Sequence, residues 1–125
     1  MNYLLDTHVL LDLLSAPQRI GRAVRRVLED PLNDVVVSSA SAWEMTIKAS
    51  LGRLRPPDDL EAELFREGID SLDITLSDAL KAGALPHHHK DPFDRMLVAQ
   101  AQNHAMTLVT RDPMLATYDV RILVP

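Results

Sequence analysis

The chain contains no cysteine among its 125 residues. It therefore has no disulfide framework and no thiolate metal site, which agrees with a reducing compartment. Aromatic residues are also scarce, at one Trp, two Tyr and two Phe. The hydrophobic residues, 46% of the chain, must then build the core mainly from Leu, Val, Ile, Ala and Met. This length and composition predict a single domain over residues 1–125.

Long apolar runs and an excess of positive charge are absent too. No run approaches the length that crosses a bilayer, and the N-terminal segment MNYLLDTHVLL lacks the basic start of a signal peptide. We therefore expect a soluble, cytoplasmic protein. The formal net charge of −5 argues against broad electrostatic binding of nucleic acid, although local basic patches are compatible with it.

Short apolar runs alternate with helical patterns along the sequence. The runs predict strands at 3–5, 35–37, 107–109 and 121–124, with a weaker one at 71–74. The patterns predict helices over 19–28, 40–51, 60–68, 77–84 and 92–104, the fourth of them capped by Ser77. This alternation predicts an α/β fold around a central, mostly parallel sheet.

Two acidic residues follow predicted strands. Asp6 comes directly after the strand at 3–5, at the end where open parallel sheets gather their ligands, but it is equally suited to cap a following helix. Asp112 follows the strand at 107–109 and is equally suited to cap the turn that begins at Pro113. Whether the two carboxylates meet depends on the strand order, which this reasoning leaves open.

Glu44 interrupts an apolar stripe of the predicted helix 40–51. It shares positions 40, 44, 47 and 51 with Ala40, Ile47 and Leu51. Burying an unpaired carboxylate costs several kcal/mol, so Glu44 is a candidate for chemistry. The alternative is that the edge of the stripe is exposed, or that Glu44 pairs with Lys48.

Asp94 interrupts a second apolar stripe, on the predicted helix 92–104 beside Leu97 and Val98. It lies in the first turn, where the helix dipole favours an anion. Asp91 differs, because an Asp followed by Pro92 is the usual start of a helix. We therefore assign Asp91 to structure and Asp94 to chemistry.

Carboxylates that lie close together repel one another and retain protons unless a cation neutralises them. Hard oxygen ligands without cysteine suit Mg²⁺ or Mn²⁺. An acid-only site of this kind suits metal-dependent hydrolysis of phosphodiester bonds. The sequence is compatible with one metal ion or with two.

Four segments, in order and with similar spacing, resemble the PIN-domain ribonucleases, and most closely the VapC toxins of bacterial toxin–antitoxin pairs. They are residues 4–8 (LLDTH), 38–44 (SSASAWE), 88–95 (HHKDPFDR) and 110–112 (TRD). The resemblance implies a three-layer α/β/α sandwich that cleaves RNA endonucleolytically with Mg²⁺ or Mn²⁺. It places Asp6, Glu44 and Asp94 on the family's three acidic positions, with Asp6 and Asp94 favoured as direct ligands, and Asp112 on a fourth, more variable one.

The resemblance also implies a cognate antitoxin that inserts a segment across the site, and a homodimer. In this interpretation Thr7 and Thr110 orient the carboxylates or a water molecule. Basic residues close to the acidic segments are candidates for contacting RNA, namely Lys48, Arg53, Lys90, Arg95 and Arg111. Arg95 has the alternative of pairing with a neighbouring acid.

Three other features have plainer explanations. The four arginines between positions 19 and 26 are more typical of a solvated helix face than of an RNA-binding surface. Three consecutive histidines at 87–89 cannot easily face one zinc ion, so we expect a solvated loop near the mouth of the site. Trp43 is expected to anchor the core or an interface rather than to stack on a base.

Two other functional classes remain open at this point. One is a phosphotransfer domain with Asp6 as its nucleophile, although position 8 is His rather than a second Asp. The other is a degenerate nuclease fold that serves as a protein-binding module. The presence of all four acidic residues weighs against this second class.

Overall fold

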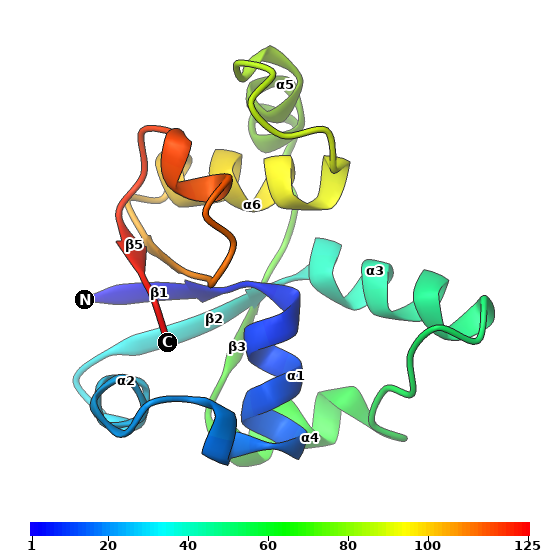
Figure 1. The fold of residues 1–125 in the computed structure, drawn as a ribbon, viewed down its shortest axis with the longest axis vertical. Helices are drawn as coiled ribbons and strands as arrows, with labels where there is room; N and C mark the ends of the chain where they lie inside the picture. The colour runs from blue at the N-terminus through cyan, green and yellow to red at the C-terminus, as the bar shows by residue number, and fades with distance from the viewer.

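A computed structural model describes the whole chain, Met1 to Pro125, and places a five-stranded parallel sheet between two helical layers (Figure 1). The strands are β1 (Asn2–Leu5), β2 (Asp34–Ser38), β3 (Asp70–Leu72), β4 (Thr107–Val109) and β5 (Ile122–Leu123). The helices are α1 (Thr7–Ser15), α2 (Arg22–Glu29), α3 (Ser39–Ser50), α4 (Leu60–Glu67), α5 (Leu76–Ala84) and α6 (Pro92–Asn103), with short 3₁₀ helices η1 (Pro17–Arg19) and η2 (Leu115–Thr117). The predicted α/β/α sandwich is confirmed.

Alternation along the strands explains why the sheet has a helical layer on each face. In β1, Tyr3 and Leu5 pack into one buried cluster with side chains of α1, α2, α3 and α4, while Leu4 packs into another with α5 and α6. Figure 1 shows α5 and α6 above the sheet and α1, α2 and α4 below it. Because both faces are covered, the central strands are apolar throughout rather than alternating. None of the helices is both long and apolar enough to span a membrane.

The order of the strands decides whether Asp6 and Asp112 lie near each other, which the sequence alone left open. It is β3-β2-β1-β4-β5, so the chain builds the sheet outward from β1 on one side and then returns to the other side. Leu5 pairs with Val109, which places Asp6 and Thr110 at neighbouring strand ends. Ligands of open α/β sheets bind outside the carboxyl ends of the strands at such a reversal.

Several element boundaries differ from the predicted ones. The predicted helix 19–28 begins later, at Arg22, because Ile20 is extended and Gly21 is the N-cap. α5 is capped by Thr75 rather than by Ser77, in a reciprocal arrangement with Asp78. Helix α1 was not predicted as an element of its own, because its nearly continuous apolar run, THVLLDLLS, hides the helical period.

The carboxylate of Asp78 ties α5 to α6. It is 1% exposed, accepts a hydrogen bond from the Thr75 N–H and another from the Asn103 amide, and lies 3.6 Å from His104. Burial by itself opposes ionisation, but these donors and the charge of His104 lower the pKa of Asp78 below its usual value.

We expect Asp78→Ala to lower the free energy of unfolding by about 1–3 kcal/mol near neutral pH, since charge-assisted hydrogen bonds are lost. Because the folded pKa is lowered, this contribution is complete above the usual carboxyl pKa and fades as the pH falls through the folded value. Urea denaturation at several pH values measures it, with the exposed Asp73→Ala as the control. Equal effects of the two substitutions would contradict this role.

Candidate metal centre

An acidic cleft of about 470 Å³ opens where β1 and β4 end. Its lining holds all four acidic residues singled out from the sequence, together with one that was assigned to structure. These five are Asp6, Glu44, Asp91, Asp94 and Asp112. The structure therefore brings together carboxylates from the residue after β1, from α3, from the start of α6 and from the segment after β4.

Asp6 serves as a helix cap and as a cleft residue at the same time. Its Oδ1 atom accepts hydrogen bonds from the His8 N–H (2.7 Å) and the Val9 N–H (3.4 Å), which begin α1. Its Oδ2 atom accepts one from the Thr110 hydroxyl at 2.6 Å. A carboxylate that is 5% exposed and held by three donors is a poor nucleophile, which disfavours a phosphotransfer role for Asp6.

Glu44 is buried and paired. The Thr7 hydroxyl donates to its Oε1 atom at 2.7 Å, and the Lys48 ammonium lies 2.7 Å from its Oε2 atom. The hydrogen bond to Glu44 raises the pKa of Lys48, against the effect of burial. The alternative pairing considered for Glu44 therefore exists, although Glu44 also lines the cleft. Its charge is already balanced within the protein.

The stripe that singled out Glu44 is only partly buried. Leu51, at its far end, is 60% exposed, and the inward face of α3 runs through Ser41 and Met45 instead. Glu44 lies at the border between these faces, which is why it reaches both the cleft and Lys48. The corresponding stripe on α6 is buried as expected at Leu97 and Val98.

Asp94 is the carboxylate whose charge is least compensated. Burial and the nearby charges of Asp91 and Asp6 raise its pKa to about 7, with a smaller contribution from Glu44, while His89 acts in the opposite direction. A carboxylate whose pKa is raised in this way binds either a proton or a metal cation. Among the cleft residues, Asp94 therefore gives the strongest electrostatic reason for a bound metal.

Asp91 caps α6 as predicted, but it does more than that. Its Oδ1 atom accepts hydrogen bonds from the Phe93 N–H (2.8 Å) and the Asp94 N–H (3.4 Å), and Pro92 opens the helix. Asp91 also lines the cleft, and its charge raises the pKa of Asp94. The purely structural assignment was therefore incomplete.

Asp112 both shapes a turn and faces the cleft. Its Oδ1 atom accepts a hydrogen bond from the Met114 N–H at 2.9 Å, and its own N–H donates to the Thr110 hydroxyl at 3.1 Å. Its Oδ2 atom lies 3.0 Å from Nε2 of His89.

His89 is the residue of this site that sequence reasoning missed. His87 and His88 are exposed, as expected for a solvated loop, but the side chain of His89 is only 18% exposed and lies between Asp112 and Asp94. Sequence reasoning treated the three histidines as one group and asked only whether they bind zinc, so it did not consider that His89 has a different position from the other two. The available signal was that His89 lies two residues before Asp91, the cap of α6.

The structure does not bring Arg95 to the cleft. Its guanidinium is buried and donates to the carbonyl oxygens of Ala82 (2.8 Å), Leu85 (3.0 Å) and Pro86 (2.9 Å). A guanidinium committed to these carbonyls is not free to bind RNA, and it pairs with no neighbouring acid. We therefore assign Arg95 to the fold, where it satisfies the C-terminal end of α5.

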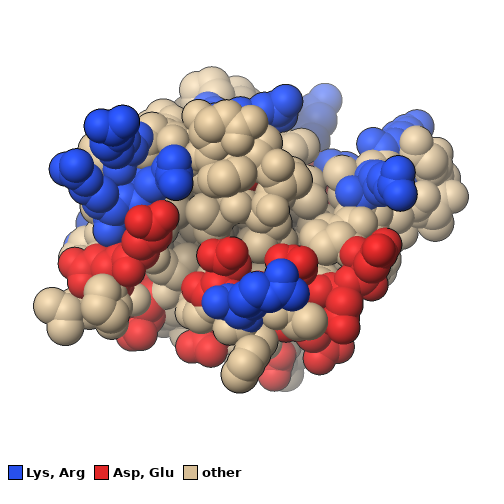
Figure 2. Space-filling model, turned by 90° about the horizontal axis from the view of Figure 1, so that it is seen from below, with Lys and Arg blue, Asp and Glu red and all other residues tan.

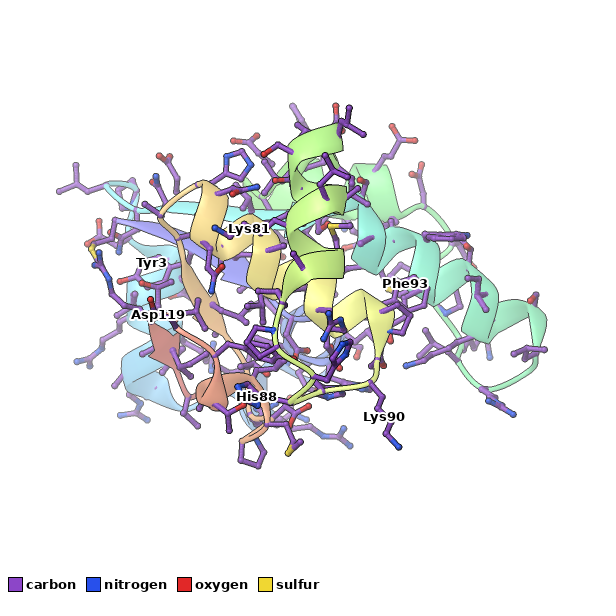
Figure 3. The ribbon with its side chains drawn as sticks, turned by 90° about the horizontal axis from the view of Figure 1, so that it is seen from above. Tyr3, Lys81, His88, Lys90, Phe93 and Asp119 are labelled. Atoms are coloured by element: carbon purple, nitrogen blue, oxygen red, sulfur yellow. The ribbon has the colours of Figure 1, made fainter.

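The other RNA candidates are distributed unevenly. Lys48 and Arg111 line the cleft, and Asp12 holds the Arg111 guanidinium at 2.8 Å. Figure 3 shows Lys90 extending away from the body of the protein.

The face seen in Figure 2 carries basic side chains over α2, at the left, beside a broad acidic area, as expected for a solvated helix face.

Trp43 does not enter the core. It is 62% exposed and packs edge-on against Phe93 with the ring centroids 5.4 Å apart, so that α3 contacts the start of α6 (Figure 3). Of the two expectations for Trp43, a place in the core is wrong, whereas an interface anchor stays a prediction.

The donor set of the cleft fits a hard divalent cation. It consists of carboxylate oxygens supported by two threonine hydroxyls, without sulfur. Asp6 and Asp94 would hold the ion, since the charge of Glu44 is already offset by Lys48.

Comparison with known proteins agrees with this geometry. The PIN domain family matches residues 3–120. Ribonuclease VapC22 of Mycobacterium tuberculosis is 31% identical over 118 residues, covering 92% of this chain and 90% of that protein. Among solved structures, VapBC2 of Rickettsia felis bound to a promoter DNA fragment superposes with a TM-score of 0.75 at 15% identity, over 99% of this chain and 98% of that one. DNA-bound VapBC of Salmonella typhimurium gives 0.69 at 18% identity, with the same coverage.

Proposed function

Since the chain belongs to the PIN-domain family, and within it to the VapC type, we propose that it is a divalent-metal-dependent endoribonuclease and the toxin of a toxin–antitoxin pair. Mg²⁺ is the proposed ion and Mn²⁺ its substitute. One observation carries the proposal: Asp6, Glu44 and Asp94 line a single cleft in which the charge of Asp94 has no sufficient partner.

Each side chain then has a separate task. When bound, the cation supplies Lewis-acid chemistry that acidifies water and offsets charge on the phosphate. Asp6 and Asp94 hold the ion, and the Thr110 hydroxyl fixes the orientation of Asp6. Lys48 and Arg111, on the cleft wall, bind phosphate oxygens of the RNA.

The proposed partner is a cognate antitoxin that covers the cleft. The structural neighbours from R. felis and S. typhimurium are described as VapBC bound to DNA, which supports a partner of the VapB kind. We also propose a homodimer, on the resemblance to the family.

A comparison of substrates tests the class of reaction. The purified, partner-free chain is incubated with a mixed RNA, with single-stranded DNA of the same sequences, and with an aryl phosphate monoester, each with Mg²⁺ or with chelator. We expect internal cleavage of RNA that requires Mg²⁺ and is lost in Asp6→Asn. Hydrolysis of the monoester alone, or cleavage that is indifferent to chelator, would refute the proposal.

Metal binding is expected to release a proton from Asp94. Because the pKa of that carboxyl is raised to about 7, the cation must displace a proton below this pH but not well above it. The apparent affinity for Mg²⁺ should therefore rise up to about tenfold per pH unit below pH 7 and level off above about pH 8.

Calorimetric titrations in two buffers of different ionisation enthalpy count the released protons. Asp91→Asn is the informative variant, because removing that charge lowers the pKa of Asp94 and moves the pH dependence to lower pH. A Mg²⁺ affinity that does not change between pH 6 and pH 8 would contradict this coupling.

A further inference from the structure

His89 has a fixed place in the loop between α5 and α6. Its backbone N–H donates to the Tyr118 hydroxyl at 2.9 Å, and its carbonyl oxygen lies 3.4 Å from the Arg95 guanidinium. The neighbouring His88 ring packs against Tyr118 with the ring centroids 5.0 Å apart. Figure 3 shows His88 beside the C-terminal segment that carries Tyr118. The backbone of His89 is therefore held in place by Tyr118 and Arg95.

The hydrogen bonds of the ring define its tautomer. The Asp91 N–H donates to Nδ1 of His89 at 3.0 Å. A backbone N–H can only donate, so Nδ1 is the acceptor and the ring hydrogen lies on Nε2. This Nε2–H is directed at Asp112 Oδ2, 3.0 Å away, and Asp94 Oδ2 lies 3.2 Å from the same nitrogen.

We propose that His89 is a positioning residue of the metal centre: its Nε2–H holds Asp112 beside Asp94, so that both carboxylates face the same cation. This inference rests on the metal-dependent function proposed above. Asp112 lies on the turn after β4, and its side chain is 32% exposed. The Met114 N–H holds only its Oδ1 atom, so the orientation of Oδ2 depends on His89. Asp94, by contrast, is fixed by its place in the first turn of α6.

The same geometry argues against His89 as a metal ligand. Ligation through Nε2 requires the ring hydrogen to move to Nδ1, where it would face the Asp91 N–H. If His89 only donates a hydrogen bond to a carboxylate, all the metal ligands are oxygen atoms, and the site keeps its preference for hard cations such as Mg²⁺. His89 therefore acts on the metal through Asp112 and Asp94.

Variants of His89 test the proposal by metal affinity, which is independent of catalysis. Side chains that support a metal ligand from outside typically contribute 10–100-fold to affinity, so His89→Ala should weaken Mg²⁺ and Mn²⁺ to the same extent, by about tenfold or more. His89→Gln places an amide N–H near the position of Nε2 and should restore affinity to within about threefold of wild type. His89→Asn, whose amide is too short to reach, should behave like His89→Ala.

Two further measurements separate positioning from a general effect on the fold. In an Asp112→Asn background, His89→Ala should cost less than about threefold in affinity, since the residue through which it acts is already changed. Ring nitrogen resonances of His89 in wild type should report the Nε2–H tautomer both without and with saturating Mg²⁺. A purely structural role would lower the melting temperature of His89→Ala without this dependence on Asp112.

The outcomes distinguish failure of this inference from failure of the proposed function. If wild type binds neither ion, both are wrong. If wild type binds Mg²⁺ and His89→Ala binds it equally well, only the role of His89 is wrong. A selective loss of Mn²⁺ affinity in His89→Ala, or transfer of the ring hydrogen to Nδ1 on metal binding, would make His89 a ligand and overturn the proposal.

Discussion

Asp94→Asn is expected to abolish RNA cleavage and, in the same protein, to stabilise the metal-free fold. Loss of a residue that only supports a metal ligand costs 10–100-fold, so loss of a direct carboxylate ligand should lower kcat/KM by more than about 100-fold. The stabilisation has an electrostatic cause: the negative charges of Asp91 and Asp6 oppose ionisation of Asp94, and an amide carries no charge. Asparagine has nearly the same shape and volume as aspartate, so little packing is lost.

The sign of the effect on stability follows from the pKa. The folded chain holds a proton on Asp94 up to about pH 7, whereas the unfolded chain loses it near the usual carboxyl value. Metal-free wild type therefore loses stability as the pH rises between these values, and Asp94→Asn does not. Above pH 7 the variant should be more stable by roughly 1–2 kcal/mol, after allowance for partial solvent screening.

Denaturation in urea with chelator, at a series of pH values, measures this difference alongside the cleavage assay. Asp119→Asn is the matched control, since Asp119 is exposed and lies outside the cleft. An Asp94→Asn protein that is both inactive and less stable than wild type above pH 7 would show that Asp94 is a structural residue.

Arg95→Met is expected to give the largest loss of stability of any substitution near the site. The guanidinium satisfies the carbonyls of Ala82, Leu85 and Pro86, which α5 and the segment after it leave without backbone partners. Methionine fills a similar volume but leaves the buried carbonyl oxygens of Ala82 and Leu85 unpaired, at an expected cost of about 3–5 kcal/mol, whereas Pro86 keeps its hydrogen bond from the Tyr118 hydroxyl. Arg95→Lys should recover only part of this, because an ammonium cannot spread its donors over the same three oxygens.

The loss is measured as a shift of the urea midpoint at constant slope, with Arg22→Met on the exposed surface of α2 as the control. We also expect weaker metal binding in any folded fraction, since Arg95 contacts the carbonyl oxygen of His89. A change smaller than that of Arg22→Met would mean that the carbonyls find other partners, and the assignment of Arg95 to the fold would be wrong.

The sequence was sufficient to predict four of the five acidic residues that line the cleft, all except Asp91. Glu44 and Asp94 were visible because a carboxylate in an apolar helix stripe is costly without a function, and Asp6 because it ends a buried strand. Asp6 and Glu44 were also given structural alternatives, and in the structure each keeps that structural role while it lines the cleft. Asp6 caps α1 with one oxygen and accepts from Thr110 with the other, so a cap and a cleft residue are not alternatives.

The features that could not be predicted depend on long-range contacts. The placement of Asp112 in the same cleft as Asp6 requires β1 and β4 to be neighbours, which no local pattern encodes. The ring of His89 contacts the distant Asp112 carboxylate, and Arg95 contacts backbone oxygens at the end of α5 and just after it. Residue type alone therefore suggested a solvated loop for one and RNA contact for the other. Helix α1 was missed for a different reason, since a helix that is apolar on most sides carries no readable period.

The central claim is that these carboxylates form one divalent-metal centre. Anomalous diffraction from crystals of the chain grown with Mn²⁺ tests it most directly, because the signal locates the ion without reference to activity. We expect a peak within coordination distance of carboxylate oxygens of Asp6 and Asp94, and no such peak in crystals of Asp94→Asn. A protein that cleaves RNA while its manganese lies elsewhere, or while the cleft holds none at saturating concentration, would contradict the claim.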